Sequence, residues 1–304
     1  MKFAGIIAEY DPFHNGHAWQ LAQAKALGAE RVAVAMSCSL VQRGALPLLP
    51  EAVRTRSALT CGADLVFALP APCACAGAEA FARAGVALLA AAGCDGLVFG
   101  AETPDAALLM EAAELLDSDS YRAALKAQLA GGARSFAAAR QTAAAKLASD
   151  ERVAALLDKP NNNLAVEYCR AIRSLAPRME AYPLPRQGAN HGEALHSAHG
   201  QFASASALRK LWAEGGADAV APYVPEAVFP LYQEAYAAGQ YTDFSAAGRC
   251  ELALLRSACR GKTPFADIRG VSEGLEHRLE AAVRTSTTYD ELLDALTTVR
   301  YPRA

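Results

Sequence analysis

The stretch IIAEYDPFHNGHAWQL, from Ile6 to Leu21, decides how the rest of the chain is interpreted. A short apolar run is followed by a proline–aromatic pair and then by two histidines, His14 and His17, with Asn15 and Gly16 between them. A helical pattern of apolar residues begins immediately afterwards. The stretch therefore predicts a buried strand that turns directly into a helix, with both imidazoles at the turn.

Strands and helices are predicted to alternate through the segment that follows. Apolar runs of strand length lie at residues 2–10, 31–37, 64–70 and 95–102, and helical patterns lie between them at 16–29, 49–63 and 77–94. This alternation is typical of an α/β protein with a Rossmann-like parallel sheet and helices on both faces. Ligands bind such sheets beyond the carboxyl ends of the strands. We therefore expect the loops at that edge, EYDPFHNGH, MSCSLVQRG, LPAPCA and FGAET, to converge on one site.

The segment after the fourth strand is predicted to be a helical insertion. Residues 103–158 are rich in Ala, Leu and Glu, and a further helix is expected to begin near Asn163. A fifth strand is expected at 178–186, and residues 187–201 are expected to form a polar loop.

Two helix starts mark the last third of the chain. Residues 202–215 begin with serines that can cap a helix, and Glu291 lies shortly inside another capped segment. The organisation we expect is an α/β domain over residues 1–215, with a helical insertion at about 103–158, followed by a C-terminal helical region over 216–304.

Composition limits the class of protein. The chain has 304 residues, 53% of them hydrophobic, which is ample for a sizeable core. Its formal charge of −3 gives no overall attraction to nucleic acid, although a local basic face is compatible with it. We recognise no targeting segment and no membrane span. The eight cysteines are expected to be reduced core thiols of a cytoplasmic protein.

Two groups of residues invite a metal-binding interpretation, which we do not favour. Cys73 and Cys75 form a C-x-C pair, but a second pair at ligand spacing is missing. The spacing of His191, His196 and His199 matches no zinc pattern. We therefore expect no site in which protein side chains alone hold a metal.

The H-x-G-H pattern at the first helix start indicates a phosphate site. A helix N-terminus carries unpaired N–H groups and partial positive charge, and Gly16 permits close approach of a ligand. His14 and His17 can then stabilise charge on a phosphoryl group in transfer. The alternative is that both histidines only belong to a turn.

A second phosphate signal is the sequence SASALR, from Ser204 to Arg209. Ser204 or Ser206 can cap a helix, and the same hydroxyls with Arg209 can hold a second phosphate. An early H-x-G-H and a late Ser-rich turn with Arg resemble the motif pair of the HIGH nucleotidyltransferase superfamily, whose members transfer adenylyl groups from ATP.

Over nearly its whole length the sequence resembles the bacterial tRNA(Met) cytidine acetate ligase family. The stretches that carry this resemblance are GIIAEYDPFHNGH, MSCSLVQRG, GADLVFALP, LVFGAE, PNNNLAVEY, PRQGANH, FASASALR and VSEGLEHRLEAA. The resemblance implies activation of acetate with ATP to acetyl-adenylate, then acetylation of N4 of the wobble cytidine of elongator tRNA(Met). It implies ATP as substrate. For this reaction we expect Mg²⁺ to bridge the phosphates, and no nucleophilic side chain is needed.

The resemblance also implies a set of ATP-binding residues. His14, His17 and Arg209 carry the catalytic role. The full set is Ile7, Ala8, Glu9, Tyr10, Asp11, Pro12, Phe13, His14, Asn15, Gly16, His17, Ala18, Trp19, Gln20, Gly100, Asn161, Arg186, Ser204, Ser206 and Arg209. Arg43 is a further candidate for contact with tRNA or the adenylate.

The sequence departs from the family pattern at several points. The family usually has Asn where Asp11 stands, Gly-Asn where Cys38 and Ser39 stand, and a Lys-Trp pair after VQRG. A Tyr-His-Asp expected near Ala189 is replaced, and the family continues with a further helical stretch after VRYPRA. Two alternatives follow: a small-molecule adenylyltransferase acting on a nucleotide or pantetheine phosphate, and a non-catalytic nucleotide- or RNA-binding protein.

Overall fold

The computed structural model describes residues 1–41, 44–131, 136–185, 195–197, 200–260, 265–268, 271 and 274–298. The chain forms two compact units. The first comprises residues 1–131 and 139–241, and the second comprises residues 132–138 and 242–304. The expected boundary after residue 215 falls within α10 (Ala205–Val220), where Gly216 departs from helical dihedral angles.

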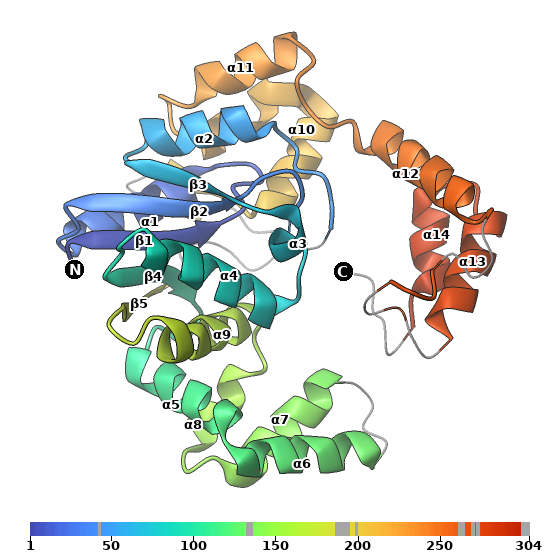
Figure 1. The fold of residues 1–304 in the computed structure, drawn as a ribbon. Helices are drawn as coiled ribbons and strands as arrows, with labels where there is room; N and C mark the ends of the chain where they lie inside the picture. The colour runs from blue at the N-terminus through green and yellow to red at the C-terminus, as the bar shows by residue number, and fades with distance from the viewer. Residues whose placement is uncertain are drawn as a thin grey trace. The chain divides into compact units, whose positions relative to one another are not determined.

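A five-stranded parallel sheet forms the centre of the first unit, with the strand order β3-β2-β1-β4-β5 (Figure 1). Its strands are β1 (Phe3–Ala8), β2 (Arg31–Ser37), β3 (Leu65–Leu69), β4 (Gly96–Ala101) and β5 (Glu180–Pro185). All five predicted strands are present, and the predicted Rossmann-like α/β class is confirmed. The order reverses direction at β1, so β1 and β4 form the switch point where such sheets bind ligands.

Helices cover both faces of this sheet (Figure 1). One face carries α1 (Asn15–Ala26), α2 (Glu51–Thr60), α10 and α11 (Phe229–Ala237), and the other carries α4 (Ala78–Ala91), α5 (Ala106–Asp117) and α9 (Pro160–Leu175). Along β2, Val32 and Val34 belong to the first core, while Ala33 and Ala35 belong to the second. The alternation of side chains in a strand thus divides one apolar run between two cores.

The α4 helix lies unusually close to β1 because a glycine faces the strand. A Cβ at Gly85 would come within 2.5 Å of Ile7 Cδ1, and a Cβ at Gly5 would come within 2.8 Å of Leu89 Cδ1. Neither position has room for a side chain. The alanine- and glycine-rich sequence of this region is therefore explained by close packing of helix on strand.

The insertion between β4 and β5 is helical, as predicted. It contains α5, α6 (Asp119–Ala130), α7 (Phe136–Leu147), α8 (Glu151–Leu156) and α9. The prediction that the last of these begins near Asn163 was wrong, because α9 begins at Pro160 with Lys159 as its N-cap. Proline favours the first helical position, since its missing N–H has no intrahelical partner there.

Short elements complete the first unit. They are α3 (Ala71–Ala74), the antiparallel pair β6 (Leu195–Ser197) and β7 (Gly200–Phe202), and the 3₁₀ turn η1 (Ala221–Tyr223). The β6–β7 pair corrects part of the polar loop expected over 187–201. Ser204 is the N-cap of α10, as the serine-rich start predicted.

The second unit contains α12 (Phe244–Ala258), α13 (Leu275–Thr285) and α14 (Tyr289–Leu296). Its small core includes Leu252, Val283 and Leu292. Thr288 and Glu291 form the predicted capping box at the start of α14. The helical character expected for this part of the chain is therefore present.

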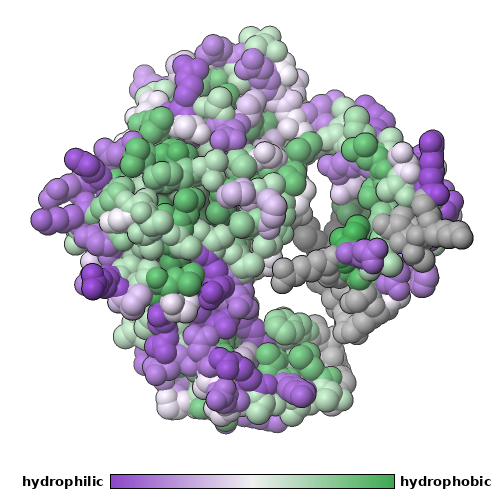
Figure 2. All heavy atoms as spheres, in the orientation of Figure 1, coloured by the Kyte–Doolittle hydropathy of each residue, from purple (hydrophilic) through white to green (hydrophobic). Residues whose placement is uncertain are grey.

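Figure 2 shows apolar residues over the face of the first unit where α2, β3 and α4 lie. The edge strand β3 belongs to this face, and its Leu65 is 46% exposed. Among the described helices, none combines the length and the apolar character needed to cross a membrane.

Candidate nucleotide-binding site

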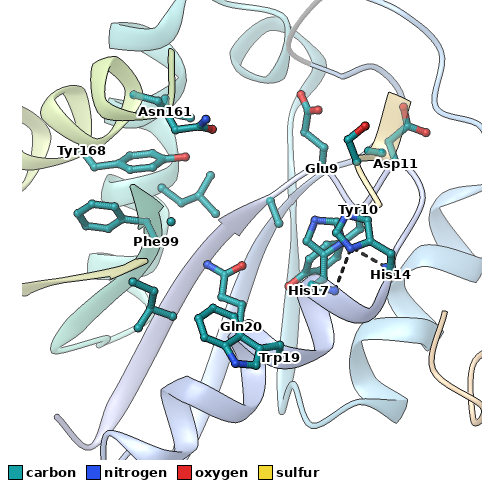
Figure 3. A pocket seen from close by; sticks show the side chains of 18 of the residues that line it. Glu9, Tyr10, Asp11, His14, His17, Trp19, Gln20, Phe99, Asn161 and Tyr168 are labelled. Atoms are coloured by element: carbon teal, nitrogen blue, oxygen red, sulfur yellow. Dashed lines mark hydrogen bonds between the residues drawn. The ribbon is translucent and has the colours of Figure 1, made fainter. Parts of the chain in front are cut away.

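A cavity of about 380 Å³ lies at the carboxyl end of β1 and β4, between the starts of α1, α9 and α10. Figure 3 shows its two sides: Glu9, His14 and His17 on one, and Phe99, Asn161 and Tyr168 on the other. The predicted convergence of loops at this edge of the sheet is therefore present for the loops after β1 and β4.

The two histidines form the cap of α1. His14 is the N-cap residue, and its Nδ1 accepts a hydrogen bond from the Gly16 N–H at 3.0 Å. His17 Nδ1 accepts from the His14 N–H at 3.3 Å, which closes a reciprocal capping box. A nitrogen that accepts carries no proton, so the proton of each neutral ring lies on Nε2. Each imidazole is thus fixed as an Nε2–H donor by the helix that it caps.

This arrangement refines the phosphate site expected from the sequence. The Gly16 N–H is used by His14, so imidazole N–H groups, rather than that backbone amide, are the donors that the α1 start offers. The rings stack with centroids 3.7 Å apart. A Cβ at Gly16 would lie 2.9 Å from His14 Cε1, so glycine is required here for the position of the ring.

The Tyr10 ring packs against the His17 ring. Its ring centroid lies 4.8 Å from that of His17 and 4.9 Å from that of Phe13, both edge to face. Tyr10 has a left-handed backbone with φ of 50°, which is uncommon for a residue other than glycine. The Asp11–Pro12 peptide bond that follows is cis. Burial raises the pKa of the Tyr10 phenol well above its usual value.

The start of α10 brings the second predicted motif to the same cavity. Ser204 Oγ accepts from the Ala207 N–H at 3.2 Å and lies 3.0 Å from Ser206 Oγ. Arg209 does not line the cavity; its Nη1 donates to Asp11 Oδ2 at 3.1 Å and to the Asp11 carbonyl at 2.7 Å. The two motifs, which lie far apart in the sequence, are therefore joined directly by an ion pair.

Asp11 is buried at the centre of this junction. Its Oδ1 accepts from the Leu48 N–H at 2.6 Å, and its side chain is 4% exposed. Burial raises the pKa of Asp11, while Arg209, the Leu48 N–H and Arg54 act to lower it. Asp11 thus connects the first loop to both α10 and the loop before α2.

Arg54 is the largest fully buried side chain of the described residues. Its guanidinium donates to the carbonyls of Glu9 at 2.7 Å, Ser37 at 2.6 Å and Leu49 at 3.0 Å, and also to that of Cys38. Burial lowers its pKa, and Asp11 opposes this effect. Arg54 therefore ties together the chain after β1, the end of β2 and the start of α2.

The three consecutive asparagines at the start of α9 have different hydrogen-bond partners. Asn162 is 1% exposed and exchanges hydrogen bonds with Thr103, and Asn163 Nδ2 donates to the Leu157 and Lys159 carbonyls. Only Asn161 lines the cavity. Its Nδ2 donates to Glu102 Oε1 at 2.6 Å. Hydrogen bonds from the two asparagines lower the pKa of Glu102 despite partial burial.

An apolar wall faces the histidines across the cavity. It includes Phe81, Phe99, Leu164 and Tyr168, which the sequence analysis did not identify. The Phe99 and Tyr168 rings lie 5.4 Å apart. The spacing of Asn161, Leu164 and Tyr168 is that of one helical face, which could have predicted their common orientation.

The predicted ATP-binding residues divide into three groups. Those that line the cavity are Ile7, Ala8, Glu9, Tyr10, Asp11, His14, Gly16, His17, Trp19, Gln20, Gly100, Asn161 and Ser204. Those placed elsewhere are Pro12, Phe13, Asn15, Ala18, Ser206 and Arg209. Arg186, like Arg43 and His191, lies outside the described residues, as does the side chain of His196.

Several of these residues stabilise the fold through core packing or hydrogen bonds to backbone carbonyls. Phe13 is fully buried in the core, Asn15 Nδ2 donates to the Pro222 carbonyl, and Gln20 Nε2 donates to the Val98 carbonyl at 3.1 Å. Within the described part of the chain, no three His, Cys, Asp or Glu side chains are arranged to hold a metal. All eight cysteines are free thiols.

A parallel sheet with capped helix starts and fixed N–H donors at its carboxyl edge defines a nucleotide-binding α/β protein.

Comparison with known proteins identifies the family of nucleotide-binding proteins to which the chain belongs. A family model described as HIGH Nucleotidyl Transferase matches residues 1–304. The tRNA(Met) cytidine acetate ligase of Syntrophotalea carbinolica is 36% identical over 306 residues, which cover 100% of this chain and 71% of that protein. The protein of the same name from Acetivibrio thermocellus is 34% identical over 314 residues, which cover 100% of this chain and 74% of that one.

Solved structures agree with the sequence comparison. The crystal structure of apo Thermotoga maritima TmcAL matches 99% of this chain and 72% of its own, with a TM-score of 0.90 and 30% identity. The same protein bound with alpha-thio ATP matches with a TM-score of 0.88. The chain belongs to the HIGH nucleotidyl transferases and, among them, to the tRNA(Met) cytidine acetate ligase family.

Proposed function

We propose that this protein activates acetate with ATP and acetylates N4 of the wobble cytidine of elongator tRNA(Met). The observation that carries the proposal is the pair of imidazoles fixed as Nε2–H donors at the start of α1, beside the cavity. The names of the relatives, and the alpha-thio ATP bound by the structural neighbour, support the choice of reaction and of nucleotide.

In the first step, an acetate oxygen attacks the α-phosphorus of ATP, and the bond from that phosphorus to the bridging oxygen breaks. The products are acetyl-adenylate and pyrophosphate. His14 and His17 donate hydrogen bonds to phosphate oxygens as charge moves toward the leaving pyrophosphate. The partial positive charge of the α1 start acts in the same direction. Ser204 extends the polar surface of the cavity from α10, and Arg209, held by Asp11, orients that helix start.

In the second step, the cytidine N4 attacks the acetyl carbonyl, AMP leaves, and the amine loses a proton. An anticodon base is unpaired in the free tRNA, so its exocyclic amine is accessible. No side chain of the protein becomes covalently bonded in either step. The contribution of the chain is to position the reactants and to stabilise charge.

Mg²⁺ forms part of this proposal. The ion prefers oxygen ligands and usually binds through one or two carboxylates together with substrate phosphates and water. Glu9 and Asp11 are the two acidic residues that line the cavity, and the Asp11 carboxylate accepts from the Leu48 N–H and from Arg209. The donor set therefore fits an ion that arrives on the nucleotide, with Glu9 holding it from the protein. Bound there, Mg²⁺ would neutralise phosphate charge.

The direct test uses ATP, isotopically labelled acetate and elongator tRNA(Met), with mass spectrometry of the digested tRNA. The expected product is labelled N4-acetylcytidine at the wobble position. In the cell, we expect the reaction to take place in the cytoplasm, because tRNA is used there. ATP–pyrophosphate exchange that ignores acetate would instead favour a small-molecule adenylyltransferase. Intact ATP binding without any exchange would favour a non-catalytic nucleotide-binding protein.

Two substitutions of His17 distinguish the role of Nδ1 in the α1 cap from the role of Nε2–H in the reaction. His17→Ala removes both, whereas the Oδ1 of His17→Asn can still accept from the His14 N–H and preserve the α1 cap. We expect both variants to lose acetate-dependent pyrophosphate exchange by about 100-fold or more, by analogy with the loss of other transition-state donors. Because His17→Asn keeps the cap but loses the ring contacts with His14 and Tyr10, its melting temperature should fall less than that of His17→Ala.

The control is His277→Ala, which removes an exposed histidine of α13. Exchange in this variant should match that of the wild type. Wild-type exchange in His17→Asn would contradict the phosphate role of the Nε2–H group.

A further inference from the structure

The start of α9 differs from the start of α1 because a carboxylate already occupies it. Glu102, one residue after β4, accepts from the Asn162 N–H at 2.7 Å through Oε2. Its Oε1 accepts from the Asn161 N–H at 3.3 Å and from Asn161 Nδ2 at 2.6 Å. The positive end of this helix is therefore neutralised from within the protein. A phosphate is disfavoured there, which leaves the nucleoside as the part of ATP that faces Asn161.

The carboxylate also decides the orientation of the Asn161 amide. An ionised carboxylate only accepts hydrogen bonds, so the atom of Asn161 that contacts Glu102 has to be the NH₂ group. Hydrogen bonding lowers the pKa of Glu102, which keeps it ionised at neutral pH. The carbonyl Oδ1 of Asn161 is thereby left as the polar atom that this side chain presents to the cavity that it lines.

We propose that Glu102 is a positioning residue that makes Asn161 a hydrogen-bond acceptor, so that the site selects ATP through a donor group of its nucleoside. This inference rests on the proposed use of ATP. Two groups of ATP have the required chemistry: the 6-amino group of adenine and a ribose hydroxyl. A fixed acceptor rejects a nucleotide that lacks the donor, because the Asn161 oxygen is then covered by the bound nucleoside without a hydrogen-bond partner.

Glu102→Gln tests the orientation with almost no change of shape. The glutamine oxygen can replace only one carboxylate oxygen. The Asn161 side chain, whose Nδ2 lies 2.6 Å from Oε1, can turn to match either end of the new amide, whereas the two backbone N–H groups cannot. Of the two backbone contacts, the one with the Asn162 N–H, at 2.7 Å, is much shorter than the one with the Asn161 N–H, at 3.3 Å, so the oxygen should take the Asn162 side. The glutamine NH₂ then faces the Asn161 side chain, whose amide must turn its own carbonyl toward it. Asn161 would present a donor to the cavity in place of an acceptor.

The measurement is the dissociation constant of ATP, ITP, 2′-deoxyATP and 3′-deoxyATP for each variant, by isothermal titration calorimetry. ITP lacks the 6-amino group, and each deoxy analogue lacks one hydroxyl, so the analogue that binds weakly identifies the donor. For the wild type, we expect one analogue to bind roughly tenfold or more weakly than ATP. In Glu102→Gln, this ratio should fall to about one. The ratio does not depend on the fraction of protein that is folded.

Two further variants distinguish positioning from simple capping of α9. If Glu102 acts through Asn161, Glu102→Gln combined with Asn161→Ala should discriminate among the four nucleotides no differently from Asn161→Ala alone. Thr103→Ala is the matched control, because Thr103 bonds Asn162 and not Asn161. It should keep the wild-type ratio.

Three results would overturn the inference: an unchanged ratio in Glu102→Gln, equal wild-type affinity for all four nucleotides, or additive effects in the double variant. A wild-type protein that binds no ATP would refute the proposed function itself. Wild-type ATP binding with an unchanged ratio in Glu102→Gln would refute only the role of Glu102.

Discussion

At the scale of single residues, function depends on which atom of a side chain the fold has already used. The Nδ1 atoms of His14 and His17 accept hydrogen bonds in the α1 cap, so the donor of each ring is its Nε2–H group. Asn161 donates its NH₂ group to Glu102, while Asn162, the next residue, accepts from the Thr103 N–H and donates to the Thr103 hydroxyl. Identical residue types therefore have different chemical roles within one turn of helix.

Tyr10 and Tyr232 form a matched pair that tests how the hydrogen bonding of one buried hydroxyl affects stability. Both side chains are buried, but Tyr10 Oη has no partner among the described residues, whereas Tyr232 Oη donates to the Phe13 carbonyl at 2.7 Å. A buried hydroxyl without a partner costs about 1–3 kcal/mol, and a net hydrogen bond contributes about 1 kcal/mol. Tyr10→Phe should therefore raise the free energy of unfolding by about 1 kcal/mol, and Tyr232→Phe should lower it by about the same amount.

Urea denaturation followed by circular dichroism measures both changes. Each variant removes the same atom, so differences in the unfolded state largely cancel. Destabilisation by Tyr10→Phe would show that its hydroxyl has a partner in solution.

At the scale of elements, the site is built from helix starts. The first turns of α1, α9 and α10 all reach the cavity, and in each a different side chain accepts from the backbone N–H groups: His14, Glu102 and Ser204. A helix start satisfied by imidazoles remains favourable to anions, while one satisfied by a carboxylate does not. Under the proposed function, the start of α1 would therefore face the phosphates of ATP and the start of α9 its nucleoside.

Arg54 fixes the chain after β1 relative to the end of β2 and the start of α2. Arg54→Met would leave the buried carbonyls of Glu9, Ser37 and Leu49 without their donor. We expect a loss of at least about 3 kcal/mol in the free energy of unfolding, because several buried acceptors become unsatisfied together. Arg56→Met is the control: its side chain is 61% exposed, and the change should stay within about 0.5 kcal/mol. Equal effects of the two substitutions in urea denaturation would contradict the structural role of Arg54.

The elements show what sequence periodicity can and cannot predict. Short apolar runs predicted all five strands, and the Ser-rich start predicted the α10 cap at Ser204. The roles of Arg54 and Arg209 could not be predicted in this way, because their partners are backbone or side-chain atoms distant in sequence. Tyr168 is an intermediate case: its place on the face of Asn161 follows from helical spacing once the start of α9 is known.

At the scale of the whole molecule, the two compact units have separate cores, and the thiols report on how tightly each is packed. Cys94 and Cys169 are buried in the first unit and Cys259 in the second, whereas Cys250 on α12 is exposed. Burial raises the pKa of Cys94 and of Cys169 to about 12, so that almost no thiolate is present at neutral pH.

Thiol alkylation should therefore begin at one position. With N-ethylmaleimide at pH 7, we expect Cys250 to react first, and Cys94, Cys169 and Cys259 to react only on unfolding. Peptide mass spectrometry over a time course measures the order. Cys250→Ser should remove the fastest phase without changing the others. Rapid labelling of Cys169 in the native protein would contradict the packing of the first core.

The capping of α1 has a consequence for the behaviour of the protein toward transition metals. An imidazole binds zinc or nickel through the lone pair of a ring nitrogen that carries no proton. In His14 and His17 the Nδ1 lone pair is directed at a backbone N–H, and Nε2 bears the proton. Chelation would require both rings to change tautomer and the first turn of the helix to lose its cap. In the proposed function, the histidine pair can therefore face the phosphates of ATP without the cavity becoming a site for adventitious metal.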